Sequence, residues 1–197
     1  MLLSIPAGER LAVYSCDRHL YLDSLGFSPA GNYLAAGTAS KISGGDVTTP
    51  ATLHIWDVSL CDQITQNREV PFGSPDKEVA QDERPIIVDW SNDGQQIFVG
   101  SHRSLVVVDV MTKSMEHKDI PSFQTLSDDG RFFLSTATPR KSSLGAYFWD
   151  SVTFMELGFN IPRHLPLALS PDGTLLATLS LSDDSDSSNV ISIWTLY

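Results

Sequence analysis

A four-residue sequence motif occurs four times in this chain, each time directly after a large apolar residue. The copies share Ser at the first position and Gly at the fourth, and they are Ser28–Gly31, Ser91–Gly94, Ser127–Gly130 and Ser170–Gly173. Ser can accept a hydrogen bond from the backbone two residues on, Pro presets φ at the second position, and Gly is favoured at the fourth, so each copy predicts a type I turn. An internal repeat indicates one structural unit used several times, and this repeat therefore constrains the fold most.

Two apolar runs follow each turn and predict two β-strands in every repeat. The first runs are rich in aromatic, aliphatic and small residues, as strands are: Tyr33–Thr38, Gln96–Ser101, Phe132–Ala137 and Leu175–Ser180. The second runs are Leu53–Val58, Leu105–Val110, Gly145–Asp150 and Ile191–Leu196. Three of these second runs contain a Trp, and three contain an Asp at the following position.

This order of turn, strand and Trp-Asp strand resembles the WD40-repeat β-propeller family, over roughly residues 11–196. The resemblance implies an all-β, WD40-like β-propeller of about four blades, closed or left as an incomplete ring. The whole chain, 1–197, would be one domain with repeats near 17–73, 84–119, 120–161 and 162–197. The strand before each turn would line the central channel, at Tyr21–Phe27, Ile86–Trp90, Ser122–Leu126 and Pro166–Leu169.

The resemblance also implies a hydrogen-bonded tetrad of His, Ser or Thr, Trp and Asp inside well-formed blades. The residues that match parts of it are His19, Thr38 and Trp56 in the first repeat and His164, Ser180 and Trp194 in the last. The second repeat lacks the Trp and the third lacks the His, so we expect apolar packing to replace much of the tetrad. The expected repeat anchors are Trp149 in the core and Asp57, Asp109 and Asp150 in blade packing and turn bonding.

The number of repeats leaves the assembly open. Propellers close with about 4–8 blades, and a seven-bladed ring needs roughly 300 residues at about 40–45 residues a blade. With 197 residues and four repeats, the chain is a fragment or truncated relative of a longer propeller, a half-ring that pairs with a second copy, or a ring closed on four blades. The segment Leu11–Cys16 would supply the outer strand of the last blade.

Loops on a rigid β-scaffold carry recognition, and the resemblance places several charged loop residues on one rim. This candidate binding face suits a polar, mixed-charge peptide, and its members are Lys41, Asp46, Arg103, Arg140, Lys141, Asp183, Asp184 and Asp186. The alternative is that these residues are solvated loop positions without a partner.

Composition narrows the class of partner and the compartment. The chain has 24 acidic and 13 basic residues and a net charge of −11, so we expect no binding to nucleic acid or to anionic membranes. The two cysteines, Cys16 and Cys61, exclude a disulfide scaffold and suit a reducing compartment. No apolar run approaches the ~18 residues of a membrane helix, and the first residues lack the basic start of a signal peptide. We expect a location in the cytoplasm or nucleus.

The sequence contains no Cys-x-x-Cys, His-Glu-x-x-His or Gly-x-Ser-x-Gly motif, so we expect no enzyme activity, no metal and no cofactor. The favoured function is a protein-interaction scaffold with a protein or peptide partner, or with a second copy that closes the ring. One alternative is a propeller-based hydrolase with carboxylates or a metal at the channel mouth, because Asp23 and Asp89 lie in or near predicted channel strands. A second alternative is a sensor or regulatory propeller within a longer signalling protein.

Overall fold

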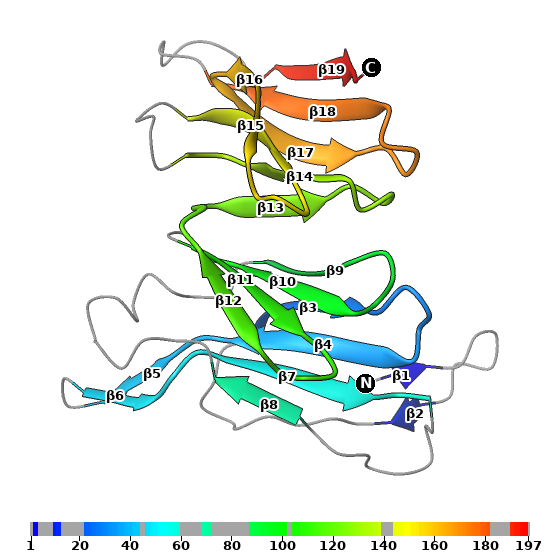
Figure 1. Cartoon of the computed structure of the whole chain (residues 1–197), viewed down its shortest axis with the longest axis vertical. Coiled ribbons are helices and arrows are strands. Elements are labelled where there is room, and N and C mark those ends of the chain that lie inside the picture. The colour runs from blue at the N-terminus through cyan, green and yellow to red at the C-terminus, as the bar shows by residue number, and fades with distance from the viewer. Residues whose placement is uncertain are drawn as a thin grey trace. The chain divides into compact units, whose positions relative to one another are not determined.

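The computed structural model describes residues 2–3, 10–12, 22–43, 46–59, 68–71, 87–101, 104–138, 144–181 and 190–196. These residues form strands and turns (Figure 1). Within these ranges no helix is long and apolar enough to cross a membrane. The chain divides into two compact units, Met1–Val88 and Asp89–Tyr197, called unit 1 and unit 2 below.

The described residues of unit 1 form one four-stranded antiparallel sheet and two short hairpins. The sheet, called the first sheet, has the order β3 (Leu22–Phe27), β4 (Tyr33–Thr38), β7 (Thr52–Asp57) and β8 (Arg68–Pro71). The hairpins pair β1 (Leu2–Leu3) with β2 (Arg10–Ala12), and β5 (Lys41–Ser43) with β6 (Asp46–Thr49).

Unit 2 takes in the other three sheets, the first of which begins two residues before the unit boundary. The second sheet has the order β9 (Ile87–Trp90), β10 (Gln96–Gly100), β11 (Leu105–Asp109) and β12 (Met115–Lys118). The third sheet has β13 (Phe123–Leu126), β14 (Phe132–Ser135), β15 (Gly145–Asp150) and β16 (Glu156–Pro162). The last sheet has three strands among the described residues: β17 (His164–Leu169), β18 (Leu175–Ser180) and β19 (Ile191–Thr195).

The strands predicted from the repeat are confirmed. β4, β15 and β18 have the predicted bounds, whereas β14 ends two residues before the predicted Ala137. Only the start of the predicted N-terminal strand is described: β2 reaches Ala12 and pairs with β1. Residues 13–16 lie outside the described ranges, so the proposed role of that segment in the last blade stays a prediction.

The core of unit 2 forms where neighbouring sheets pack face to face. Leu134, Ala146 and Phe148 of the third sheet are buried against Leu176 of the last sheet, with Trp194 at the edge of the cluster. A second, aromatic layer joins Phe98 of β10 to Phe123 and Phe133, with ring centroids 5.7–6.3 Å apart. Such centroid separations are typical of stabilising aromatic pairs.

In unit 1 the equivalent apolar cluster consists of Ala36, Trp56 and Val58, with Leu34 packed against it. Trp56 leaves only 5% of its surface exposed. Trp56 therefore belongs to the buried apolar cluster of the first sheet, as expected for a side chain of this size.

One backbone bond recurs in all four sheets and fixes the turn against the third strand. The residue that follows the end of that strand donates its N–H to the carbonyl of the residue after the turn Gly. The four bonds are Val58 to Asn32, Val110 to Gln95, Ser151 to Arg131 and Leu196 to Thr174, at 2.7–3.1 Å. The repeat in sequence is therefore a repeat in structure.

Candidate interaction surface

The Ser-x-x-Gly turns share one hydrogen-bond network. The Gly N–H donates to the Ser carbonyl at 2.7–2.9 Å in all four copies, and each of these Gly residues has φ near +70°. A positive φ favours Gly over any residue with a Cβ atom. The predicted four-residue turn is therefore confirmed.

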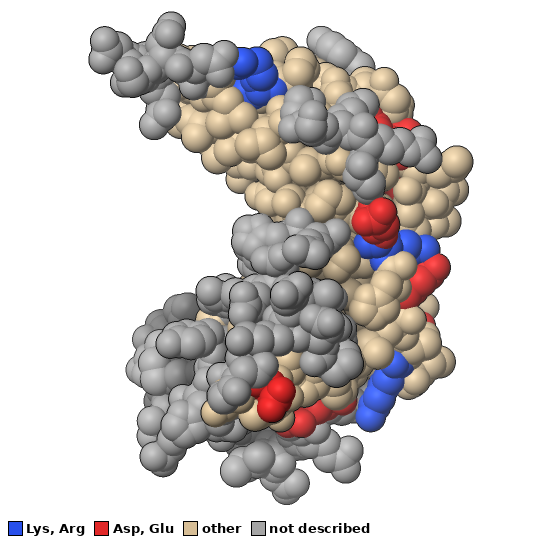
Figure 2. All heavy atoms as spheres, turned by 90° about the vertical axis from the view of Figure 1, so that its left-hand side faces the viewer, with Lys and Arg blue, Asp and Glu red and all other residues tan. Residues whose placement is uncertain are grey.

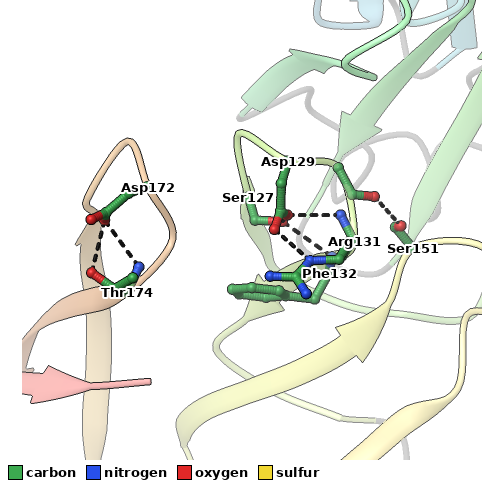
Figure 3. Close-up of polar contacts among 8 residues, drawn as sticks. Ser127, Asp129, Arg131, Phe132, Ser151, Asp172 and Thr174 are labelled. Carbon is green, nitrogen blue, oxygen red and sulfur yellow. Dashed lines mark hydrogen bonds and ion pairs between the residues drawn. The ribbon is translucent and has the colours of Figure 1, made fainter. Parts of the chain in front are cut away.

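The Ser side chain plays a different role from the predicted one. In the second turn Ser91 Oγ accepts from the N–H of Gln96, five residues on rather than two, at 2.9 Å. The same Ser91 hydroxyl donates to Asp93 Oδ1 at 2.6 Å. The third turn repeats this with Ser127, Asp129 and Phe132, as Figure 3 shows. In all four turns the Ser hydroxyl accepts from the N–H of the first residue of the next strand, at 2.9–3.1 Å, including the first turn, which has no Asp.

The Asp at the end of the third strand closes a second turn. Asp109 Oδ1 accepts from the backbone N–H and the hydroxyl of Thr112, both at 2.7 Å. Asp150 does the same with Thr153, at 2.7 and 2.8 Å. Asp57 accepts from the N–H of Ser59 at 3.0 Å. The three predicted anchor carboxylates thus lie in turn bonds.

These two kinds of turn meet around a hollow of about 610 Å³ in unit 2. Four carboxylates line it: Asp93, Asp109, Glu116 and Asp129. Its aromatic residues are Phe98 and Phe154, whose ring centroids lie 6.4 Å apart. The hollow is therefore lined by four carboxylates and two aromatic residues, of which Phe154 is half-buried and Phe98 only 2% exposed.

Turn bonds lower the pKa of three of these carboxylates, Asp93, Asp109 and Asp129. The hydroxyl of Ser91, followed by the N–H of Gln95, holds the pKa of Asp93 below its usual value. The backbone N–H and then the hydroxyl of Thr112 lower the pKa of Asp109. Hydrogen bonds to a carboxylate favour its charged form. Within the described residues, Asp93 and Asp109 accept hydrogen bonds from neutral donors, which leave their negative charge in place.

Two cations partly offset the other two carboxylates. Lys118 pairs with Glu116, and Arg131 pairs with Asp129. The backbone N–H of Arg131 is the main group that lowers the pKa of Asp129. Figure 2 shows blue and red side chains adjacent to one another on the described surface of unit 2. The charge that remains available in the hollow therefore belongs mainly to Asp93 and Asp109.

The tetrad-like residues of the last repeat are only partly paired as expected. The Trp194 Nε1–H donates to the hydroxyl of Thr178 at 2.8 Å, not to that of Ser180. Ser180 lies opposite His164 in the register of β17 and β18, and the His164 ring meets Trp194 edge-on at 5.2 Å. Thr178 reaches the indole because Trp194 pairs with Leu176, which places Thr178 two residues away on the same face.

The third sheet repeats this pairing with a residue that the sequence interpretation missed. Trp149 Nε1–H donates to Ser135 Oγ at 2.8 Å, and Ser135 is fully buried. Ser135 and Thr178 hold the same place, five residues after their turn Gly. Counting outward from the Trp across an antiparallel pair would have identified both hydroxyls.

In the first sheet a different His accompanies Thr38. Thr38 Oγ1 lies 3.3 Å from His54 Nε2, and His54 Nδ1 lies 3.6 Å from Glu69. The His54 ring stacks on Trp56 at a centroid distance of 5.7 Å. The order hydroxyl, imidazole and carboxylate is that of a hydrolase triad. Thr38, however, is fully buried within the sheet, so a substrate has no access to its hydroxyl. His19, the predicted partner, lies outside the described residues.

The predicted binding face falls mostly outside the described ranges, which do not include Arg103, Arg140, Lys141, Asp183, Asp184 and Asp186. Of the other two members, Lys41 lies on β5 and Asp46 is exposed at the start of β6. These two described members lie in one hairpin of unit 1, and the predicted binding face as a whole stays a prediction.

The carboxylates considered for a hydrolase site have structural contacts where they can be described. Asp89 Oδ1 accepts from the N–H of Trp90 at 2.9 Å, and Asp89 Oδ2 accepts from the N–H of Leu126 at 3.1 Å. Asp89 thereby links β9 to β13. Asp23 lies on β3. Within the part of the chain that is described, no group of three or more His, Cys, Asp or Glu side chains is arranged to hold a metal ion.

Three solved structures resemble this chain over nearly its whole length. TolB from Acinetobacter baumannii matches 98% of this chain and 45% of its own, with 18% identity and a TM-score of 0.60. The match with a chain of a Mitotic Checkpoint Complex covers 98% of this chain and 55% of that chain, with 16% identity and a TM-score of 0.66. The match with U3-55K covers 92% of this chain and 50% of that chain, with 11% identity and a TM-score of 0.56.

The chain therefore spans about half the length of the solved structures it matches. No protein-family profile and no curated protein matches the sequence. The neighbours are propellers and include WD40-type propellers, so the four antiparallel sheets are propeller blades. The predicted fold class, an all-β propeller with about four blades, is confirmed.

Proposed function

We propose that this chain is a non-catalytic protein-interaction module of WD40-repeat type, and that the hollow of unit 2 receives a basic segment of a partner protein. One observation carries the proposal: a single concave site joins carboxylates held in the ionised form to the half-buried ring of Phe154. A Lys or Arg side chain suits this combination, since its charged head pairs with carboxylates while its stem or guanidinium plane packs on aromatic rings.

The unit itself contains an example of this chemistry. The Lys118 ammonium lies 4.2 Å from the centroid of the Phe154 ring while it pairs with Glu116. A partner cation that entered the hollow would meet the same kind of surroundings beside Asp93 and Asp109. Val152, 81% exposed at the hollow, adds an apolar contact.

The polar side chains that resemble catalytic groups support a non-catalytic role. Thr38 is buried, and Asp89 has both carboxylate oxygens engaged by backbone N–H groups. A catalytic carboxylate must instead lie within hydrogen-bond reach of a reacting group. We extend the proposal to a protein partner in the cytoplasm or nucleus, following the composition of the chain.

The test is a binding assay with two pools of fluorescent peptides of equal length, one rich in Arg and Lys and the other in Glu and Asp. We expect the chain to bind the basic pool, with an affinity that falls as salt rises, because exposed charge pairs are screened. Replacing both Asp93 and Asp109 with Asn should weaken binding by about tenfold, since an exposed charge pair contributes roughly 0.2–1 kcal/mol.

A matched control exists in the same chain. Asp172 and Asp150 occupy the equivalent turn positions and have pKa values lowered by equivalent bonds, but neither lines the hollow. The double variant Asp150→Asn with Asp172→Asn should lose similar turn bonds and keep full affinity for the basic pool. Equal losses in both double variants, or no binding by the unaltered chain, would contradict the proposal.

The hydrolase alternative is tested separately by elemental analysis of the purified chain and by assays with ester and lactone substrates. A stoichiometric metal ion, or turnover that is lost when Asp89 is replaced by Asn, would replace the scaffold proposal with the enzymatic one.

A further inference from the structure

A second concave site of unit 2, called the aromatic pocket below, is lined by residues of the third and last sheets. Its volume is about 280 Å³, and it shares no lining residue with the hollow. Its apolar lining consists of Phe132, Phe148, Leu157, Phe159 and Leu196. Sites for small molecules usually have roughly 300–1,000 Å³, so this pocket has the size for a ligand with a single ring.

Strand register brings a carboxylate and three aromatic rings to one face of the third sheet. Phe132 lies opposite Asp150 in the pairing of β14 with β15, and residues directly opposite one another share a face. Phe148 shares that face because it lies two residues before Asp150 on the same strand. Phe159 of β16 packs on Phe148 with ring centroids 4.3 Å apart. Asp150 therefore lies beside the rings that line the pocket.

Much of the apolar lining is open to a ligand. Phe159 and Leu157 are 50% and 46% exposed, and Phe132 and Leu196 are half-buried. Phe148 is only 1% exposed, so it supports the other rings from behind. Aromatic rings stabilise one another by offset and edge-to-face contacts beyond the burial of their area. The open rings thus favour a ligand that itself carries an aromatic ring.

Two side chains of opposite charge, Arg131 and Asp150, line the same pocket. They belong to neighbouring positions of adjacent strands, because the Ser151 N–H donates to the Arg131 carbonyl at 3.1 Å. Arg131 uses Nε to pair with Asp129 and does not pair with Asp150. In the described part of the chain, this contact leaves the two terminal nitrogens of the guanidinium available to an anionic group.

The Asp150 carboxylate has one engaged and one available oxygen. Its Oδ1 accepts from the N–H groups of Val152 and Thr153 and from the Thr153 hydroxyl, at 2.7–3.1 Å. The backbone N–H and then the hydroxyl of Thr153 lower the pKa of Asp150, so the group is ionised at neutral pH. Among the described contacts none engages Oδ2, which is therefore available to a cationic group.

We propose that the aromatic pocket binds a free aromatic α-amino acid with an apolar ring, such as L-phenylalanine. The ring packs on Phe132, Leu157 and Phe159, the ammonium pairs with Asp150, and the carboxylate pairs with the terminal nitrogens of Arg131. A free amino acid carries both charges next to one carbon, whereas a residue inside a peptide carries neither. Among the described lining residues, Arg131 and Asp150 supply all the polar side chains, so a phenyl ring fits better than a phenol.

The first experiment titrates the full chain with L-phenylalanine and with analogues that each lack one group, using calorimetry and saturation-transfer NMR. L-alanine lacks the ring and should bind at least about tenfold more weakly, because ring burial supplies most of the affinity. 2-Phenylethylamine lacks the carboxylate and 3-phenylpropionate lacks the ammonium. Each should bind about threefold more weakly, since an exposed charge pair contributes modestly. N-acetyl-phenylalaninamide stands for a residue inside a peptide and should bind more weakly than either.

Variants then assign each charge to its partner. Arg131→Gln should make L-phenylalanine and 2-phenylethylamine bind equally, and Asp150→Asn should do the same for L-phenylalanine and 3-phenylpropionate. Phe159→Ala should weaken L-phenylalanine binding at least about fivefold while circular dichroism shows the fold unchanged. The matched control is Asp57→Asn, since Asp57 holds the position of Asp150 at the end of β7 in the first sheet. It should leave the affinity unchanged.

The inference does not rest on the proposed protein partner, so the two can fail separately. Absence of saturable L-phenylalanine binding would overturn it. So would equal binding of L-alanine, or an Asp57→Asn variant that loses as much affinity as Asp150→Asn. Binding of N-acetyl-phenylalaninamide at least as tight as that of L-phenylalanine would also overturn it, and would identify the pocket as a contact for an aromatic residue of a peptide.

Discussion

The hydrogen bond between Trp149 and Ser135 supports a quantitative prediction, because the same bond exists in a more exposed setting. In the third sheet Ser135 is fully buried and Trp149 is 7% exposed, and their bond is 2.8 Å long. In the last sheet the Trp194–Thr178 bond has the same length, but Trp194 is only partly buried. Replacing either hydroxyl removes the acceptor of an indole N–H.

The cost of that loss depends on whether water can reach the indole. In Ser135→Ala the Trp149 N–H stays buried without its acceptor, which costs about 1–3 kcal/mol. Ser135 Oγ also donates to the carbonyl of Ala137 at 2.6 Å, so we expect a value near 2 kcal/mol. In Thr178→Val the partly exposed Trp194 can turn to water, and the cost should be about 0.5–1.5 kcal/mol.

Urea unfolding followed by Trp fluorescence and circular dichroism measures both costs. With an m-value of about 2 kcal/mol/M, Ser135→Ala should lower the midpoint by about 1 M. A double-mutant cycle with Trp149→Phe, which has no N–H, isolates the pairwise energy. We expect a coupling of at least about 1 kcal/mol. Additive effects of Ser135→Ala and Trp149→Phe, or a larger loss for Thr178→Val than for Ser135→Ala, would refute the reasoning.

Three further predictions concern packing, backbone strain and pH. Gly100→Ala should destabilise the chain by about 1–3 kcal/mol in urea unfolding, because the new Cβ would lie 2.8 Å from Phe123. Gly31→Ala has open space around the new Cβ but a backbone φ of +70°, so backbone strain alone should cost about 1–2 kcal/mol. A neutral result for either variant would contradict the geometry. Phe148→Ala should cost about 3–5 kcal/mol and lower the thermal midpoint, whereas a change below 1 kcal/mol would mean that the buried cluster is not formed. The bond from Ser170 holds the pKa of Asp172 below its usual value, so its stabilisation is complete above the unfolded pKa of about 4 and is lost as pH falls through the lower folded pKa. In Asp172→Asn the free energy of unfolding should therefore fall less steeply as the pH is lowered below about 4. An unchanged pH dependence would exclude this contribution.

Much of the fold follows from the sequence because its causes are local. Each Ser-x-x-Gly motif closes a turn by a backbone hydrogen bond between residues three apart. The apolar run that follows the motif has the composition of a β-strand. Strand bounds such as Tyr33–Thr38 could therefore be predicted to the residue. The recurrence of Asp109 and Asp150 likewise indicated turn bonding, since both bond within three residues.

The missed pairings depend on strand register rather than on local sequence. Ser180 was the expected hydroxyl because it lies seven residues after its turn Gly, yet Trp194 meets Thr178. Only the antiparallel register of β18 and β19, which sets Leu176 opposite Trp194, decides between the two. The same holds for Ser135 in the third sheet.

The sequence alone thus determined the repeated turns, the strands and their grouping into four blades, since these depend on contacts within a few residues. The tertiary structure decided which polar groups meet. It assembled the hollow from Asp93, Asp109 and Asp129 of two sheets, and it left Ile193 open where Phe148 is covered. The physical reason is that a residue's burial is set by the sheet packed against it, which its own neighbours in the chain do not specify.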